Sequence, residues 1–97
     1  MSKNKLAKFE EMKAFENVIQ APFKTIKDQN FHLRGQWSTG YFPLKNPLIL
    51  ELGCGKGEYT VELAERFPGK NFIGVDIKGA RLWKGAKTAL EKNLENV

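Results

Sequence analysis

The chain has 97 residues, of which 41% are hydrophobic and 28% charged, and its net charge is +5. This length allows one small domain or part of a larger one, and the hydrophobic share excludes wholesale disorder. A single cysteine, Cys54, and a single histidine, His32, exclude an intramolecular disulfide and the usual cysteine or histidine metal sites. No apolar run approaches the roughly 20 residues of a membrane helix, and no signal peptide is recognisable. We therefore expect a protein of the reducing cytoplasm that binds no membrane and no metal.

Residues 1–46 form a basic N-terminal extension. They carry eight Lys and Arg residues against four Asp and Glu, whereas residues 47–97 carry eight against seven. Such an excess attracts polyanions such as tRNA or another nucleic acid. Lysines on an ordinary solvated surface give the same count, so both interpretations stay open.

A short amphipathic helix is predicted at the start of the extension, between residues 4 and 19. Its apolar side chains recur at every third position: Leu6, Phe9, Met12 and Phe15. After Pro22 the chain is polar and irregular as far as an aromatic stretch at residues 37–42. Such rings can stack on nucleotide bases. We expect them instead to attach the extension to the domain that follows.

Residues 47–97 alternate between strand and helix. The predicted elements are a buried parallel strand at 47–52, a helix at 58–67, a strand at 71–77 and a longer helix at 79–95. This order predicts an α/β fold, the β-α-β-α part of a doubly wound parallel sheet. Two strands do not cover both faces of the helices, and the chain ends on what looks like the approach to a third strand. We therefore expect the first half of a Rossmann-like domain, truncated at Val97.

Helical spacing also predicts which side chains face the core. The helix at 58–67 should place Val61, Ala64 and Phe67 on its buried side. The helix at 79–95 should carry an apolar stripe of four side chains: Trp83, Ala86, Leu90 and Leu94.

A glycine-rich loop joins the first predicted strand to the first predicted helix of this domain. Gly53, Gly55 and Gly57 alternate there with Cys54 and Lys56. Gly53 permits a tight turn out of the strand, Gly55 lets a ligand approach the backbone, and Gly57 permits close packing or a positive φ. The helix behind the loop presents free backbone N–H groups. The loop is therefore a candidate ligand site.

The residues around the loop narrow the choice of ligand. A Walker A phosphate loop is excluded because Lys56 precedes Gly57 and Glu58 stands where Ser or Thr would bind magnesium. A dinucleotide fits poorly, because the third glycine comes one place early and the pyrophosphate would meet Glu58. A ligand without phosphates, such as S-adenosylmethionine, fits better.

Two acidic residues complete the predicted cofactor site. Glu51, two positions before Gly53, can accept hydrogen bonds from the ammonium group of the ligand. Asp76 lies 21 positions after Gly55 at the end of the second strand and can receive both ribose hydroxyls. The ribose acid alone does not separate this ligand from NAD, and an α/β domain whose glycines merely turn the chain is a further alternative.

From Leu50 to Tyr59 and from Asn71 to Arg81, the chain resembles the bacterial tRNA (guanine-N7-)-methyltransferases, a family of class I S-adenosylmethionine-dependent methyltransferases. The opening also resembles the N-terminal extension of the family, at Lys3-Asn4-Lys5-Leu6, Phe9, Asn17-Val18 and Gln20. The resemblance implies methyl transfer to N7 of a guanine in the tRNA variable loop. It places Glu51 and Asp76 at cofactor-contacting positions, and many members have Glu where Asp76 stands. The family's Asp-Pro-Trp-Pro-Lys segment and guanine-binding residues lie downstream, so the catalytic residues are unknown.

Other residues are open to two interpretations. Cys54 lies at a helix N-terminus, which favours thiolates, but no base stands beside it and we expect a small side chain that fills the loop. The last helix carries a basic series that either faces phosphates or is solvated: Lys78, Arg81, Lys84 and Lys87. Two other functions compete with the methyltransferase: a non-catalytic nucleic-acid-binding module with a basic arm, and the NAD-binding half of an oxidoreductase.

Overall fold

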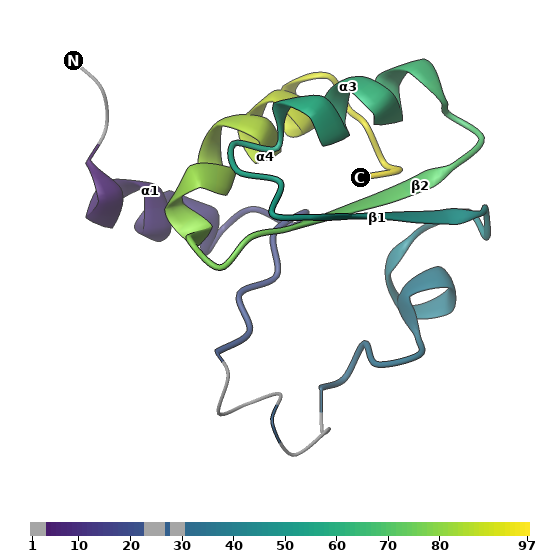
Figure 1. Ribbon diagram of the computed structural model, residues 1–97, viewed down its shortest axis with the longest axis horizontal. Coiled ribbons are helices and arrows are strands. Elements are labelled where there is room, and N and C mark those ends of the chain that lie inside the picture. The colour runs from purple at the N-terminus through teal and green to yellow at the C-terminus, as the bar shows by residue number, and fades with distance from the viewer. Residues whose placement is uncertain (1–3, 23–26, 28–30) are drawn as a thin grey trace.

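The computed structural model describes residues 4–22, 27 and 31–97 (Figure 1). Its elements are α1 (Lys5–Met12), a π-helical turn (Trp37–Tyr41), β1 (Leu48–Leu52), α3 (Glu58–Arg66), β2 (Asn71–Val75), a 3₁₀ turn (Gly79–Arg81) and α4 (Leu82–Glu91). None of these helices is long and apolar enough to cross a bilayer. Within the described ranges, acidic, histidine and cysteine side chains form no group of three or more suited to a metal ion.

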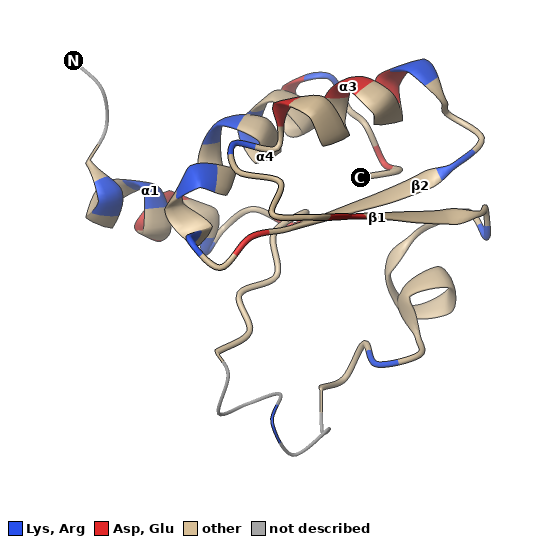
Figure 2. Cartoon of the chain, viewed as in Figure 1, with Lys and Arg blue, Asp and Glu red and all other residues tan. Residues whose placement is uncertain are grey.

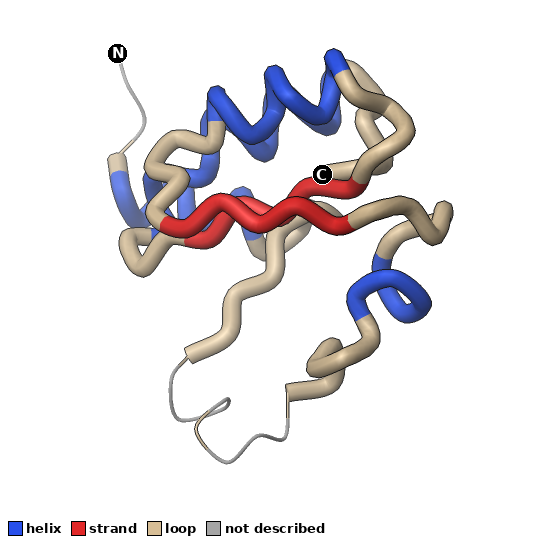
Figure 3. Tube along the Cα trace, turned by 45° about the vertical axis from the view of Figure 1, so that its right-hand side comes forward, coloured by secondary structure: helices blue, strands red, loops and turns tan. Residues whose placement is uncertain are grey.

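The two strands form a parallel sheet. β1 and β2 pair from Leu48 opposite Asn71 to Leu52 opposite Val75. Both α3 and α4 lie on one side of this sheet, and the π-helical turn lies on the other (Figures 1 and 3). The predicted α/β class and the order of its four elements are confirmed.

The end of the chain returns to the outer edge of β2. The Asn71 N–H donates to the Pro47 carbonyl on the β1 side, so the next N–H along the strand, that of Phe72, faces the opposite edge. There it donates to the carbonyl of Asn96 at 2.7 Å. Asn96 thus occupies part of the edge of β2 that β1 leaves open.

The core lies between the sheet and the two helices. Phe72 is only 2% exposed, and Val61, Ala64 and Ala89 are buried with it. Phe67, predicted to be buried, is 46% exposed because α3 ends at Arg66 and Phe67 only caps it. The burial predicted for α3 is therefore correct for two of the three side chains, Val61 and Ala64.

The apolar stripe predicted for α4 is wrong in detail. The fully buried positions of this helix are Gly85 and Ala89. Of the predicted stripe, Leu90 is exposed and three side chains are half-buried: Trp83, Ala86 and Leu94. The cause is close packing: Gly85 donates its N–H to the Lys56 carbonyl at 3.0 Å, which turns the small residues of the helix inward. α4 also ends at Glu91, four residues earlier than predicted.

The burial predicted for β1 is also wrong. Leu48, Leu50 and Leu52 are all exposed, Leu52 by 75%. Side chains alternate along a strand, and the side chain of Glu51 reaches Thr60 of α3, so these three leucines point away from the helices. In the described parts of the chain, no element buries that face of β1.

α1 begins as predicted but ends early, at Met12. The Asn4 side chain caps it by accepting the N–H of Ala7 at 2.8 Å. Met12 is buried, whereas Leu6 is 77% exposed. The reason is geometric, because residues six positions apart in an α-helix lie about 120° apart around its axis. Beyond the helix, the Asn17 side chain donates to the Ala86 carbonyl at 3.1 Å and ties the chain to α4.

The rings of the aromatic stretch contact one another. The rings of Trp37 and Tyr41 are 6.0 Å apart, and those of Tyr41 and Phe42 are 4.8 Å apart. Phe42 is buried. The link to the α/β part comes from a neighbouring segment, where the Asn71 side chain donates to the Leu44 carbonyl at 2.8 Å.

Candidate functional site

The glycine-rich loop lies at the carboxyl ends of the two strands. The loop begins directly after β1 and is bonded to the end of β2. The N–H groups of Gly53 and Cys54 both donate to the Val75 carbonyl, at 2.7 and 3.0 Å. Gly53, Gly55 and Gly57 have φ values of +68°, +59° and +75°. Residues other than glycine rarely adopt these backbone angles. The loop conformation therefore explains why glycine stands at all three positions.

Asp76 holds the loop in this conformation. One carboxylate oxygen accepts the Gly55 N–H at 2.8 Å, and the other accepts the Lys78 N–H at 2.7 Å. These two hydrogen bonds, with smaller contributions from the charges of Arg81 and Lys78, hold the pKa of Asp76 below its ordinary value. The carboxylate is thus charged, and each oxygen has a further lone pair for a ligand donor.

Glu51 is oriented by a residue that the sequence analysis missed. The hydroxyl of Thr60, in the first turns of α3, donates to the Glu51 carboxylate at 2.7 Å. Thr60 is only 3% exposed. Its position one turn before Ala64, on the buried face of the helix, was the available signal, since a buried hydroxyl needs a partner.

Two further glycines allow the loop to pack against its neighbours. A Cβ on Gly74 of β2 would lie 2.9 Å from the Cys54 Sγ, and one on Gly85 of α4 would lie 3.0 Å from the carbonyl carbon of Gly57. Neither was singled out from the sequence. A glycine inside a strand or a helix is itself a sign of close approach by another backbone or side chain.

Cys54 fits the predicted role of filling the loop. It is half-buried against Gly74. Burial, followed by the negative charges of Glu51 and Asp76, raises the pKa of its thiol. The thiol is therefore protonated at neutral pH, which disfavours it as a nucleophile.

A cleft of about 880 Å³ lies between the extension and the α/β part. Its walls include Phe9 and Trp37 from the extension and Cys54, Gly74 and Asp76 from the loop and β2.

The cleft therefore brings only part of the predicted site together. Glu51, Gly53 and Gly55 do not line it. A Cβ on Gly53 or Gly55 would meet no atom within 4 Å, so the space next to these two residues is open. The carboxylates and the glycine loop thus leave room for a ligand at the carboxyl edge of the sheet.

Comparison with known proteins gives consistent results. A family model described as putative methyltransferase matches residues 45–97. A tRNA (guanine-N(7)-)-methyltransferase of Christiangramia forsetii is 62% identical over 99% of this chain and 43% of the relative. Proteins of the same name from Bacteroides fragilis and Porphyromonas gingivalis are 48% and 54% identical, over 100% and 89% of this chain and 38% and 36% of the relatives. The chain thus spans about two fifths of their length. No solved structure matches.

Proposed function

Since the chain belongs to the family of putative methyltransferases, we propose that residues 47–97 are the first half of a Rossmann-like domain that binds S-adenosylmethionine. We further propose that this domain serves a tRNA (guanine-N7-)-methyltransferase, with residues 1–46 as its basic N-terminal extension. The names of the relatives from Christiangramia forsetii and Bacteroides fragilis support the reaction. The catalytic residues are not assigned.

One observation carries the cofactor proposal. The glycine loop stands between two carboxylates at the same edge of the sheet, and one of them, Asp76, is bonded directly to the loop through Gly55 at 2.8 Å. Glu51 is held by Thr60 on the other side. A cofactor with an ammonium group at one end and ribose hydroxyls at the other can use both acids at once.

The reaction needs little acid or base chemistry from this part of the protein. S-adenosylmethionine supplies an activated methyl group on its sulfonium, and guanine N7 is already nucleophilic. Glu51 would accept hydrogen bonds from the ammonium group, and Asp76 from the ribose hydroxyls. Their contribution to the rate is then positioning, because the methyl group must lie in line between N7 and the departing sulfur.

A dinucleotide is less well supported. Glu58 lies in the first turn of α3, where a pyrophosphate would approach the helix N-terminus. Lys84 lies 3.2 Å from this carboxylate, but both side chains are exposed. Such a surface ion pair only weakly reduces the repulsion between Glu58 and a pyrophosphate. The family match favours the methyltransferase as well.

Cofactor binding tests the proposal directly. Isothermal titration calorimetry of a full-length version should detect binding of S-adenosylmethionine, and Asp76→Ala in that protein should weaken binding by about tenfold or more, the usual scale of hydrogen bonds to a charged group. Glu62→Gln is the matched control, because Glu62 is exposed and its carboxylate pairs with Arg66 on the outside of α3. Equal affinity in Asp76→Ala and the unsubstituted protein would refute the ribose assignment.

The reaction is tested separately. Incubation of a full-length version, which carries the downstream residues that the family resemblance implies, with tRNA and S-adenosylmethionine should yield 7-methylguanosine, detected by mass spectrometry of the nucleosides. Salt-sensitive tRNA binding with no response to the cofactor would instead indicate a non-catalytic RNA-binding module. Tighter binding of NAD than of S-adenosylmethionine would indicate an oxidoreductase.

A further inference from the structure

Two lysines from distant parts of the chain are held on a single indole ring. Lys8 of α1 places its ammonium group 5.6 Å from the ring centroid of Trp83, and Lys87 of α4 places its own at 4.9 Å. Both distances are within the range of cation–π attraction. The two ammonium groups are therefore closer to each other than the sum of these distances, and the ring restricts both.

These two lysines differ from their neighbours in their ion pairs. Lys84 contacts Glu58 at 3.2 Å, and Lys92 contacts Glu65 at 2.6 Å. Within the part of the chain that the structure describes, neither Lys8 nor Lys87 has a carboxylate within 4 Å. Two like charges near one ring repel each other, and an anion close to both would offset that repulsion.

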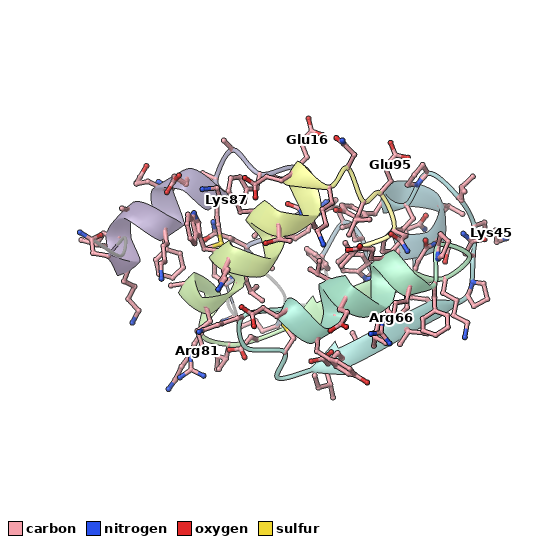
Figure 4. All side chains as sticks on the ribbon, turned by 90° about the horizontal axis from the view of Figure 1, so that it is seen from above. Glu16, Lys45, Arg66, Arg81, Lys87 and Glu95 are labelled. Atoms are coloured by element: carbon pink, nitrogen blue, oxygen red, sulfur yellow. The ribbon has the colours of Figure 1, made fainter. Side chains whose placement is uncertain are left out.

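Lys8 and Lys87 lie at the same end of the molecule as the glycine-rich loop. α1 packs on the 3₁₀ turn, where a Cβ on Gly79 would lie 3.3 Å from the ring of Phe9, and this turn begins three residues after Asp76. Blue segments gather on α1 and the first half of α4 (Figure 2). Figure 4 shows Lys87 on the part of α4 that passes α1, with Arg81 projecting from the 3₁₀ turn just before this helix.

We propose that Lys8 and Lys87, held on Trp83, bind the phosphate backbone of RNA. This inference rests on the proposed function, because a guanine can reach the methyl donor only if the backbone that carries it crosses this end of the sheet. An RNA backbone fits the site because it offers closely spaced phosphates, each of which can replace the missing carboxylate partner.

The salt dependence of tRNA binding tests the site. Fluorescence anisotropy with labelled tRNA, measured at several salt concentrations, should show strong binding by the unsubstituted protein. In the double variant Lys8→Gln/Lys87→Gln, the slope of log K against log salt should become shallower by about 1.5, because each phosphate contact contributes about 0.7–0.9. The variant Lys8→Arg/Lys87→Arg keeps both charges and the ring contacts and should retain the slope.

Lys70→Gln is the matched control. Lys70 also lies over a ring, 5.3 Å from the centroid of Phe67, but it precedes β2 at the opposite end of the strand from Asp76. Its loss should leave the slope unchanged. An unchanged slope in the double glutamine variant, or an equal loss in Lys70→Gln, would overturn the proposed surface and leave the methyltransferase proposal intact.

Two further outcomes separate the proposals. A protein that binds S-adenosylmethionine but no tRNA would refute both the RNA substrate and this surface. Displacement of tRNA by polyglutamate at equal charge concentration would indicate an acidic protein as the partner and would also overturn the assignment. Circular dichroism and the unfolding midpoint of each variant ensure that a shallower slope does not arise from unfolding.

Discussion

Thr60 and Glu51 form a hydrogen bond that joins the start of α3 to the end of β1. The donor hydroxyl is buried, the acceptor carboxylate is half-exposed, and the oxygens are 2.7 Å apart. The bond selects one orientation of the carboxylate beside the glycine loop. Thr60 is thus a positioning residue, which would act on the cofactor only through Glu51.

Replacement of Thr60 by valine should weaken S-adenosylmethionine binding without unfolding the protein. Valine has nearly the same shape as threonine but donates no hydrogen bond, so Glu51 is released from its fixed orientation. We expect a loss of about threefold to tenfold in affinity, the scale of one intramolecular hydrogen bond. Calorimetric titration of the purified variant measures this loss.

Two other variants separate positioning from a general effect on stability. Thr60→Ser keeps the hydroxyl and should restore most of the affinity. Thr88→Val removes a comparable hydroxyl, which donates to the Lys84 carbonyl at 3.0 Å on α4, and should leave binding unchanged. Wild-type affinity in Thr60→Val would contradict the positioning role.

Gly85 should tolerate no larger side chain. A Cβ there would collide with the Lys56 carbonyl oxygen and would lie 3.0 Å from the Gly57 carbonyl carbon. Backbone atoms cannot move aside as the end of a side chain can. We expect Gly85→Ala to lower the free energy of unfolding by about 1–3 kcal/mol, as overpacking commonly does, although alanine is the better helix former by about 1 kcal/mol.

Denaturant unfolding measures this cost, and Gly69→Ala is the control. A Cβ on Gly69 would meet no atom within 4 Å, so this change should alter the free energy of unfolding by less than about 0.5 kcal/mol. If Gly85→Ala were as stable as Gly69→Ala, the close contact between α4 and the loop would be wrong.

The sequence predicted the position of the candidate site better than its internal contacts. Glu51 and Asp76 were expected at one edge because the carboxyl ends of neighbouring parallel strands coincide, and the structure places both there. The glycines at 53–57 were expected in a tight loop, since alternating glycines allow positive φ values. Both predictions depend only on local spacing and strand direction.

Burial and side-chain partners were predicted less well because they depend on which elements meet. The apolar run of β1 predicted buried leucines. Such a run does not indicate whether another element covers each face of the strand. The partner of Thr60 is set by a side-chain orientation that no spacing encodes. The close contact at Gly85 likewise follows from how α4 crosses the loop.

The thiol of Cys54 should react slowly with alkylating reagents in the folded protein. Its pKa is raised above the ordinary value of 9.0 by burial and by the charges of Glu51 and Asp76. The thiolate fraction at pH 8 is therefore smaller than in an unfolded chain. The stability contributed by the protonated thiol is present below the ordinary pKa and is lost as pH rises through the raised pKa of the folded state.

The rate of iodoacetamide incorporation, followed by mass spectrometry between pH 7 and pH 10, measures this difference. The folded protein should reach half of its maximal rate above pH 9, and urea-unfolded protein should do so at lower pH. Cys54→Ser gives the background, because the chain has no other cysteine. Faster alkylation in the folded state would indicate an activated thiol and would contradict the loop-filling role.

The two faces of the sheet should differ sharply in their sensitivity to truncation. Phe72 is 2% exposed under the helices, so Phe72→Ala should cost about 3–5 kcal/mol in the free energy of unfolding. Leu52 is 75% exposed on β1, and Leu52→Ala should cost less than about 0.5 kcal/mol, as for other surface sites. Denaturant unfolding of the two variants at the same protein concentration compares the costs directly. A loss in Leu52→Ala as large as in Phe72→Ala would mean that this face of β1 is covered in solution.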